Sequence, residues 1–141
     1  LHTNILGVTN TILPFIPHLK SQKRGKVAVV SSVASFRGLS HYSAYSGSKV
    51  AVRNFCQGWN NALYKHNISF SAICPGFVSS EMTNDQNIPQ PFKLETSLAV
   101  DKIIRAVENR KKVFIFPWQM RIITIPLMKW SPNWLIRALR M

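Results

Sequence analysis

The segment VVSSVASFRGLSHYSAYSGSKVAVRNF, residues 29–55, decides the fold of this chain, because a buried strand and a long helix meet in it. The apolar, β-branched run at residues 27–30 has the length and composition of a buried strand. Apolar residues at mostly three- and four-residue spacing predict a helix over residues 42–65. Ser31 and Ser32 stand where the strand runs out, which is the place where open α/β sheets bind ligands.

Three side chains around this junction suit one reaction. Tyr45 and Lys49 are four residues apart in the predicted helix, so they share one face. A tyrosine that exchanges a proton near pH 7 needs a pKa about 3 units below its usual 10, or roughly 4 kcal/mol. A lysine ammonium one turn away favours the phenolate, and partial desolvation strengthens this effect. With the hydroxyl of Ser32 on a substrate oxygen, the set suits proton transfer to or from a carbonyl or an alcohol.

The motif Tyr45-Ser46-Gly47-Ser48-Lys49, with Ser32 thirteen residues before its tyrosine, resembles the active site of the short-chain dehydrogenase/reductase family. The resemblance implies a Rossmann-type, doubly wound parallel α/β sheet and an oxidoreductase. Such an enzyme passes a hydride between NAD or NADP and a small carbonyl or alcohol substrate. The resemblance also assigns roles: Tyr45 is the general acid/base, Lys49 lowers its pKa and holds the nicotinamide ribose, and Ser32 orients the substrate oxygen.

Simpler interpretations of these residues stay open. Tyr45 and Lys49 can be an exposed helix pair, and Ser32 can be a turn serine at a strand end, although Ser31 is the better candidate for that structural role. The family member can also be a non-catalytic binding or scaffold protein in which the motif only supports the fold.

An asparagine near the start of the chain matches a second family pattern. Asn4 opens the sequence N-x-x-G at residues 4–7. The resemblance implies that this asparagine holds a water molecule in a proton relay from the lysine. A helix cap is the alternative for Asn4.

A proline and a glycine follow the second predicted strand, residues 68–74, which we expect to lie parallel to the first because a helix joins them. We expect Gly76 to use backbone angles that other residues avoid, which opens room for a ligand. In the family this loop continues to a threonine near the nicotinamide carboxamide, and Ser80 stands in for that threonine. The cofactor-binding residues implied by the resemblance are Tyr45, Lys49, Pro75, Gly76, Val78 and Ser80. A plain strand-to-helix turn is the alternative.

The remaining segments complete an α/β pattern. Helices are predicted at residues 3–19, where Pro14 and Pro17 should kink or end the helix, and at residues 97–110. Residues 20–26 read as a loop and residues 113–116 as a third short strand. Small residues around Gly47 indicate close packing against the helix. Residues 81–94 form a long loop, which in the family covers the substrate. The candidate apolar contacts of the substrate are Met82 and Phe92 in this loop and Phe77 before it.

The composition limits the other function classes. The chain has 141 residues and a formal net charge of +13, but its basic residues are scattered and no nucleic-acid motif accompanies them, so we expect no nucleic-acid partner. Cys56 and Cys74 read as buried thiols, and neither they nor the four histidines have metal-ligand spacing. We therefore expect no metal site. We expect a cytoplasmic location, because no leader is evident and the thiols fit a reducing compartment.

We divide the chain into residues 1–117, the catalytic half of a reductase domain, and residues 118–141, a basic amphipathic extension. The extension is too short between charges and prolines to span a bilayer. Its tryptophans and basic residues suit a membrane surface, but packing over the substrate pocket or against another subunit explains them equally.

The chain matches only the later half of the family fold. It contains no T-G-x-x-x-G-x-G phosphate loop, so nothing obvious binds the pyrophosphate of a dinucleotide. We therefore expect a fragment of a longer reductase that has little hydride-transfer activity alone. The family also implies a homo-oligomer formed through helices like the two long ones predicted in this chain.

Overall fold

Three parallel strands form the sheet in the computed structural model, which describes residues 2–39, 42–79 and 89–134. They are β1 (Gly25–Val30), β2 (Ile68–Pro75) and β3 (Val113–Phe116), in the order β1-β2-β3. The pairing of β1 with β2 runs from Gly25 opposite Ile68 to Val30 opposite Ile73, and β3 joins β2 from Ala72 onward. The predicted parallel α/β sheet is therefore confirmed for the part of the fold that this chain contains.

The N-terminal helix is longer than predicted. It passes through a π turn (Thr3–Gly7), α1 (Val8–Ile12), a 3-10 turn (Leu13–Phe15) and α2 (Ile16–Gln22). Each of its two prolines stands at the first or second position of a segment, where a missing N–H costs little, so the prolines change the type of turn without ending the helix. The prediction of a loop from residue 20 is wrong, since α2 continues to Gln22 and β1 begins at Gly25.

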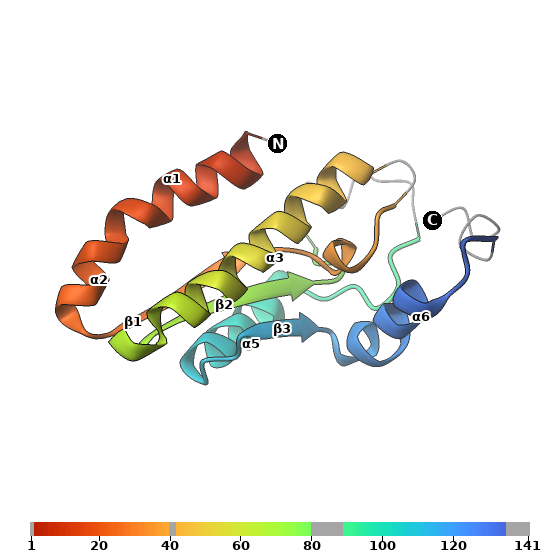
Figure 1. The fold of residues 1–141 in the computed structure, drawn as a ribbon. Coiled ribbons are helices and arrows are strands. Elements are labelled where there is room, and N and C mark those ends of the chain that lie inside the picture. The colour runs from red at the N-terminus through yellow and green to blue at the C-terminus, as the bar shows by residue number, and fades with distance from the viewer. Residues whose placement is uncertain (1, 40–41, 80–88, 135–141) are drawn as a thin grey trace.

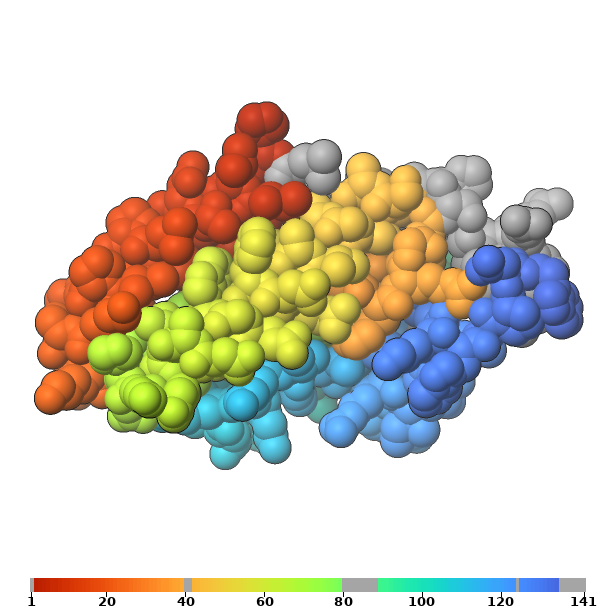
Figure 2. All heavy atoms as spheres, viewed as in Figure 1, coloured from red at the N-terminus to blue at the C-terminus, as the bar shows by residue number. Residues whose placement is uncertain are grey.

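Helices cover both faces of the sheet (Figure 1). The long helix α3 (Ser43–Leu63) and the N-terminal helices lie on one face, and α5 (Thr96–Glu108) lies on the other. The space-filling view shows the N-terminal helices lying along α3 (Figure 2). Two apolar clusters result. The α3 side buries Val29, Val52, Cys56, Leu63, Ile68, Phe70 and Ala72, and the α5 side buries Ile73, Ala99, Ala106 and Phe116. The central strand β2 therefore contributes to both clusters, as a parallel strand covered on two faces does.

A buried amide connects α3 to β2. The Nδ2 atom of Asn60 donates to the carbonyl oxygens of Cys56 (2.9 Å) and Phe70 (2.7 Å), and its Oδ1 accepts from the amide of Phe70 at 2.9 Å. Since β3 pairs with β2 only from Ala72 onward, it does not reach the polar groups of Phe70. Asn60 supplies the missing hydrogen bonds of that part of the strand.

The C-terminal segment forms a π turn (Met120–Thr124) and α6 (Ile125–Trp130). Met120, Ile125 and Met128 are buried, whereas 75% of the Trp130 surface is exposed. The segment therefore packs onto the rest of the chain through one side and leaves Trp130 largely in solvent. No helix within the described ranges has the length and apolar character needed to cross a membrane.

Candidate active site

Tyr45 and Lys49 lie in the first two turns of α3, beside the carboxyl end of β1. The Nζ atom of Lys49 donates a hydrogen bond to the carbonyl oxygen of Val30, the last residue of β1, at 3.0 Å. The same Nζ atom is 5.7 Å from the centroid of the Tyr45 ring. Tyr45 remains 40% exposed. The structure thus brings the cation and the phenol ring together at the strand end, with the phenol open to a ligand.

The surroundings of Lys49 favour its neutral form. Partial burial lowers the pKa of Lys49, and the nearby Cys74 thiol opposes this change more weakly. A poorly hydrated ammonium interacts more strongly with an anion that forms beside it, because little water screens the attraction. Lys49 is therefore well placed to stabilise negative charge close to Tyr45.

The two serines at the end of β1 have different partners. The hydroxyl of Ser31 donates to the carbonyl oxygen of Lys49 at 2.8 Å and ties the strand end to α3. The hydroxyl oxygen of Ser32 accepts from the amide of Ala34 at 3.1 Å and caps the 3-10 turn Val33–Phe36. Within residues 2–39 and 42–79, no hydrogen bond joins Ser32 to Tyr45 or Lys49. Ser31 has the predicted structural role, and the O–H of Ser32 remains able to donate to a ligand.

Asn4 contacts the helix that carries the motif. Its Nδ2 atom donates to the hydroxyl of Ser48 at 3.0 Å, and that hydroxyl donates to the carbonyl oxygen of Tyr45 at 2.7 Å. Asn4 is not a helix cap, since the first turn begins after His2 and has no side-chain cap. The role of Ser48 was not predicted. In the sequence Ser48 stands out only as a small residue, because Asn4, the partner that gives it a role, is 44 residues away.

At Gly76 the structure leaves no room for a Cβ atom. A Cβ atom on Gly76 would lie 2.9 Å from Cγ and 3.0 Å from Cε of Met120, whose side chain is 1% exposed. No glycine of the chain has a positive φ, so the prediction that Gly76 uses unusual backbone angles is wrong. The crowding expected at Gly47 itself is also wrong, because a Cβ there would meet nothing within 4 Å, whereas the close packing expected of the small residues around it is seen at Ser46 and Ser48, which are 1% exposed. Small size alone did not distinguish a packed glycine from an open one.

The segment after Pro75 and Gly76 is held at both ends. Val78 forms a parallel bridge with Leu94. The amide of Ser79 donates to the carbonyl oxygen of Leu94 at 2.8 Å, and the amide of Leu94 donates to the carbonyl oxygen of Phe77 at 3.0 Å. Ser80 and Met82 lie outside the described residues. Residues 77–79, which precede the predicted substrate-covering segment, therefore contact its last residue, Leu94, close to the carboxyl end of β2.

A family model described as short chain dehydrogenase matches residues 1–91. An uncharacterized oxidoreductase of Myxococcus xanthus is 36% identical over 138 residues, which are 98% of this chain and 54% of that protein.

Solved structures share the fold. A short chain dehydrogenase from Burkholderia cenocepacia, in complex with NADP, matches with a TM-score of 0.79 and 24% identity over 99% of this chain and 56% of its own. A short-chain dehydrogenase from Sphingobium yanoikuyae, in complex with NADPH, matches with a TM-score of 0.73 and 20% identity over 96% of this chain and 52% of its own. At these identities the likeness concerns the fold alone. The chain spans about half the length of the proteins it matches.

Proposed function

The chain belongs to the short-chain dehydrogenase family, and we propose that it is the catalytic part of a reductase that transfers a hydride between NAD or NADP and a carbonyl or alcohol substrate. The observation that carries this proposal is the placement of Tyr45 and Lys49 on one face of α3 at the end of β1. A proton donor beside a cation at a strand end is an arrangement that suits carbonyl reduction.

Four side chains divide the work in this proposal. Tyr45 gives a proton to the substrate oxygen during reduction and removes it during oxidation. Lys49 stabilises the negative charge left on the Tyr45 oxygen, and Ser32 donates a hydrogen bond to the substrate oxygen. Asn4, through Ser48, holds the backbone of Tyr45 in place. When bound, the nicotinamide cofactor supplies the hydride.

The residues present fit one end of such a cofactor. The Lys49 ammonium and the exposed Tyr45 phenol offer donors to a ribose at the end of β1. Pro75 is the last residue of β2 and Gly76 and Val78 follow it, so the three would lie near the nicotinamide. The chain has no glycine-rich phosphate loop, so its residues fit the nicotinamide riboside and not the pyrophosphate. We therefore propose that the rest of the dinucleotide is bound by a part of the protein outside these residues.

The substitution Tyr45→Phe tests the function in the whole protein. We expect turnover of a carbonyl panel, followed by nicotinamide absorbance, to fall by about 10²–10⁴-fold, the usual contribution of a general acid. The matched control is Tyr64→Phe, because Tyr64 is exposed and follows the end of α3. Retained turnover in a folded Tyr45→Phe protein would refute the assignment.

Self-association is a further part of the proposal. The N-terminal helices expose Leu6, Leu13 and Phe15 on the same side of the sheet as α3. Apolar side chains in solvent favour contact with another apolar surface. Light scattering of the whole protein should therefore report a homo-oligomer, which Leu13→Asp and Phe15→Asp should weaken.

Contact with a membrane surface is the second candidate function. Trp130 and Trp134 are exposed, and the basic residue Lys129 directly precedes Trp130 in the sequence, a combination that suits an anionic lipid surface. Cosedimentation with anionic vesicles should fall for Trp130→Ser and Trp134→Ser if this surface binds lipid. No cosedimentation of the unmodified protein would exclude the candidate.

A further inference from the structure

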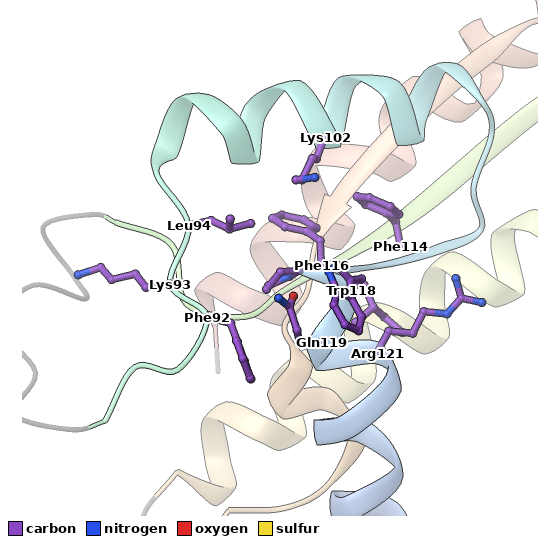
Figure 3. A pocket seen from close by; sticks show the side chains of 11 residues that line it. Phe92, Lys93, Leu94, Lys102, Phe114, Phe116, Trp118, Gln119 and Arg121 are labelled. Atoms are coloured by element: carbon purple, nitrogen blue, oxygen red, sulfur yellow. The ribbon is translucent and has the colours of Figure 1, made fainter.

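A cavity of about 480 Å³ lies at the outer edge of the sheet, beside β3 (Figure 3). It is open to solvent on one side and is lined by residues from α5, from residues 92–94 and from the chain that follows β3. None of Asn4, Ser32, Tyr45 and Lys49 lines it. β3 and β1 are the two opposite edge strands of the sheet. Lys49 donates its hydrogen bond to the end of β1, at the edge opposite to the cavity. The cavity is therefore separate from the proposed catalytic residues.

Aromatic side chains form the wall of this cavity. The rings of Phe114 and Phe116 stack with their centroids 5.3 Å apart and their planes at 28°. Phe116 is buried and belongs to the apolar cluster on the α5 side, so this part of the wall is fixed by the fold. Trp118 also lines the cavity but is 63% exposed. Flat aromatic surfaces of this kind bind the apolar body of a small molecule, and the volume is in the usual range for such sites.

Among the described residues, the charged side chains that line the cavity are positive. Lys93, Lys102 and Arg121 come from three separate segments, and the described part of the chain contributes no aspartate or glutamate to the lining. Figure 3 shows Lys102 on α5 and Arg121 on the turn after β3, at the margin of the aromatic cluster. A cavity with basic groups and no acid favours an anion, and an arginine can bind a carboxylate through two parallel hydrogen bonds.

A buried acceptor adds a polar feature. The Oε1 atom of Gln119, another lining residue, is buried and has no hydrogen-bond partner among the described residues. A buried acceptor without a donor is unfavourable. A ligand that carries an O–H or N–H group would satisfy it.

We propose that this cavity binds a small organic anion with an aromatic body, of the aromatic carboxylate class. Its ring packs on Phe114, Phe116 and Trp118, and its carboxylate is held by Lys102 and Arg121. The cavity shares Phe92 with the segment expected to cover the substrate, but none of the proposed catalytic residues lines it, and this proposal does not depend on the hydride-transfer site.

Calorimetric titration of the whole protein with 2-naphthoate, and with its neutral methyl ester, which also offers no N–H or O–H group to Gln119, tests the proposal. At low salt we expect the carboxylate to bind about fivefold or more tightly than the ester, because two exposed cations each contribute about 1 kcal/mol or less. The variant Lys102→Gln/Arg121→Gln should bind both compounds with equal affinity. Arg105→Gln is the matched control, since Arg105 is an exposed arginine on α5 that does not line the cavity.

Two further variants locate the bound compound. Trp118→Ala should lower the affinity of the protein for both compounds, and Tyr45→Phe should leave both affinities unchanged. Circular dichroism verifies that each variant is folded; the four replaced positions other than Tyr45 are exposed. The proposal is overturned if the unmodified protein binds neither compound or binds both equally. It is also overturned if Arg105→Gln lowers the affinity for 2-naphthoate as much as the double variant does, or if Tyr45→Phe abolishes the binding of 2-naphthoate.

Discussion

The guanidinium of Arg37 donates a hydrogen bond to the carbonyl oxygen of Met128 at 2.5 Å. It also reaches the carbonyl oxygen of Ser131 at 2.8 Å and the Oδ1 atom of Asn133 at 2.6 Å. The last carbonyls of a helix have no partner within the helix, so a cation at the end of α6 satisfies them. Since Arg37 follows the 3-10 turn that Ser32 caps, this contact connects the C-terminal segment to a proposed catalytic residue.

Replacement of Arg37 by Gln should release the C-terminal segment. Loss of these charge-assisted hydrogen bonds should lower the free energy of unfolding by about 1–3 kcal/mol, measured by urea denaturation. Trypsin should also cleave faster after Lys129, which lies in the released helix. Arg24→Gln is the control, because Arg24 is exposed and distant from α6 in the sequence. Equal stability and equal cleavage for the two variants would contradict a structural role for the Arg37 contact.

The contact between Asn4 and Ser48 predicts coupling between the first helical turn and α3. In a double-mutant cycle of Asn4→Ala and Ser48→Ala, we expect an interaction energy of about 0.5–1.5 kcal/mol in urea denaturation. Because Ser48 also bonds the carbonyl oxygen of Tyr45, both single variants should lower kcat of the whole protein. The pair Asn4→Ala and Asn109→Ala is the control and should be additive, since Asn109 bonds within α5 to Arg105. Additive effects in both pairs would show that the Asn4 contact contributes nothing.

The buried amide of Asn60 should be among the most stabilising polar groups in the fold. Asn60→Ala removes three hydrogen bonds and leaves the amide and carbonyl of Phe70 buried without partners. We expect a loss of about 2–4 kcal/mol in the free energy of unfolding. The neighbouring variant Asn61→Ala changes an exposed side chain and should stay within about 0.5 kcal/mol of the unmodified protein. A loss below about 1 kcal/mol for Asn60→Ala would indicate that water replaces the amide.

Local patterns in the sequence were enough to predict the strands, α3, α5 and the pairing of Tyr45 with Lys49. Each of these depends on residues close together in the chain, whose periodicity reports which side is buried. The features that escaped prediction depend on distant partners. The roles of Ser48 and Gly76 are set by Asn4 and Met120, which lie 44 residues away in each case. Packing does not explain the extension of α2, because residues 20–22 are exposed; the contact seen there is local, with the hydroxyl of Ser21 donating to the carbonyl oxygen of His18 at 2.8 Å.

The two thiols should make stability fall at alkaline pH. Burial, with a smaller effect of the nearby Cys74 thiol, raises the pKa of Cys56 from 9.0 to about 12, and burial also raises the pKa of Cys74. Above pH 9 the unfolded chain loses a proton that folded Cys56 keeps, so the free energy of unfolding decreases until the pH reaches about 12. The slope is at most about 1.4 kcal/mol per pH unit for each thiol.

Denaturation curves at several pH values between 8 and about 10 measure this slope, and Cys56→Ala should reduce it by the contribution of one thiol. The same burial predicts that neither Cys56 nor Cys74 reacts with a disulfide reagent such as dithiobisnitrobenzoate while the protein is folded. Both should react in denaturant, which is the control for reagent activity. Rapid reaction of either thiol in the folded protein would contradict the burial of these side chains. A free energy of unfolding that does not decrease between pH 8 and about 10 would contradict the raised pKa values.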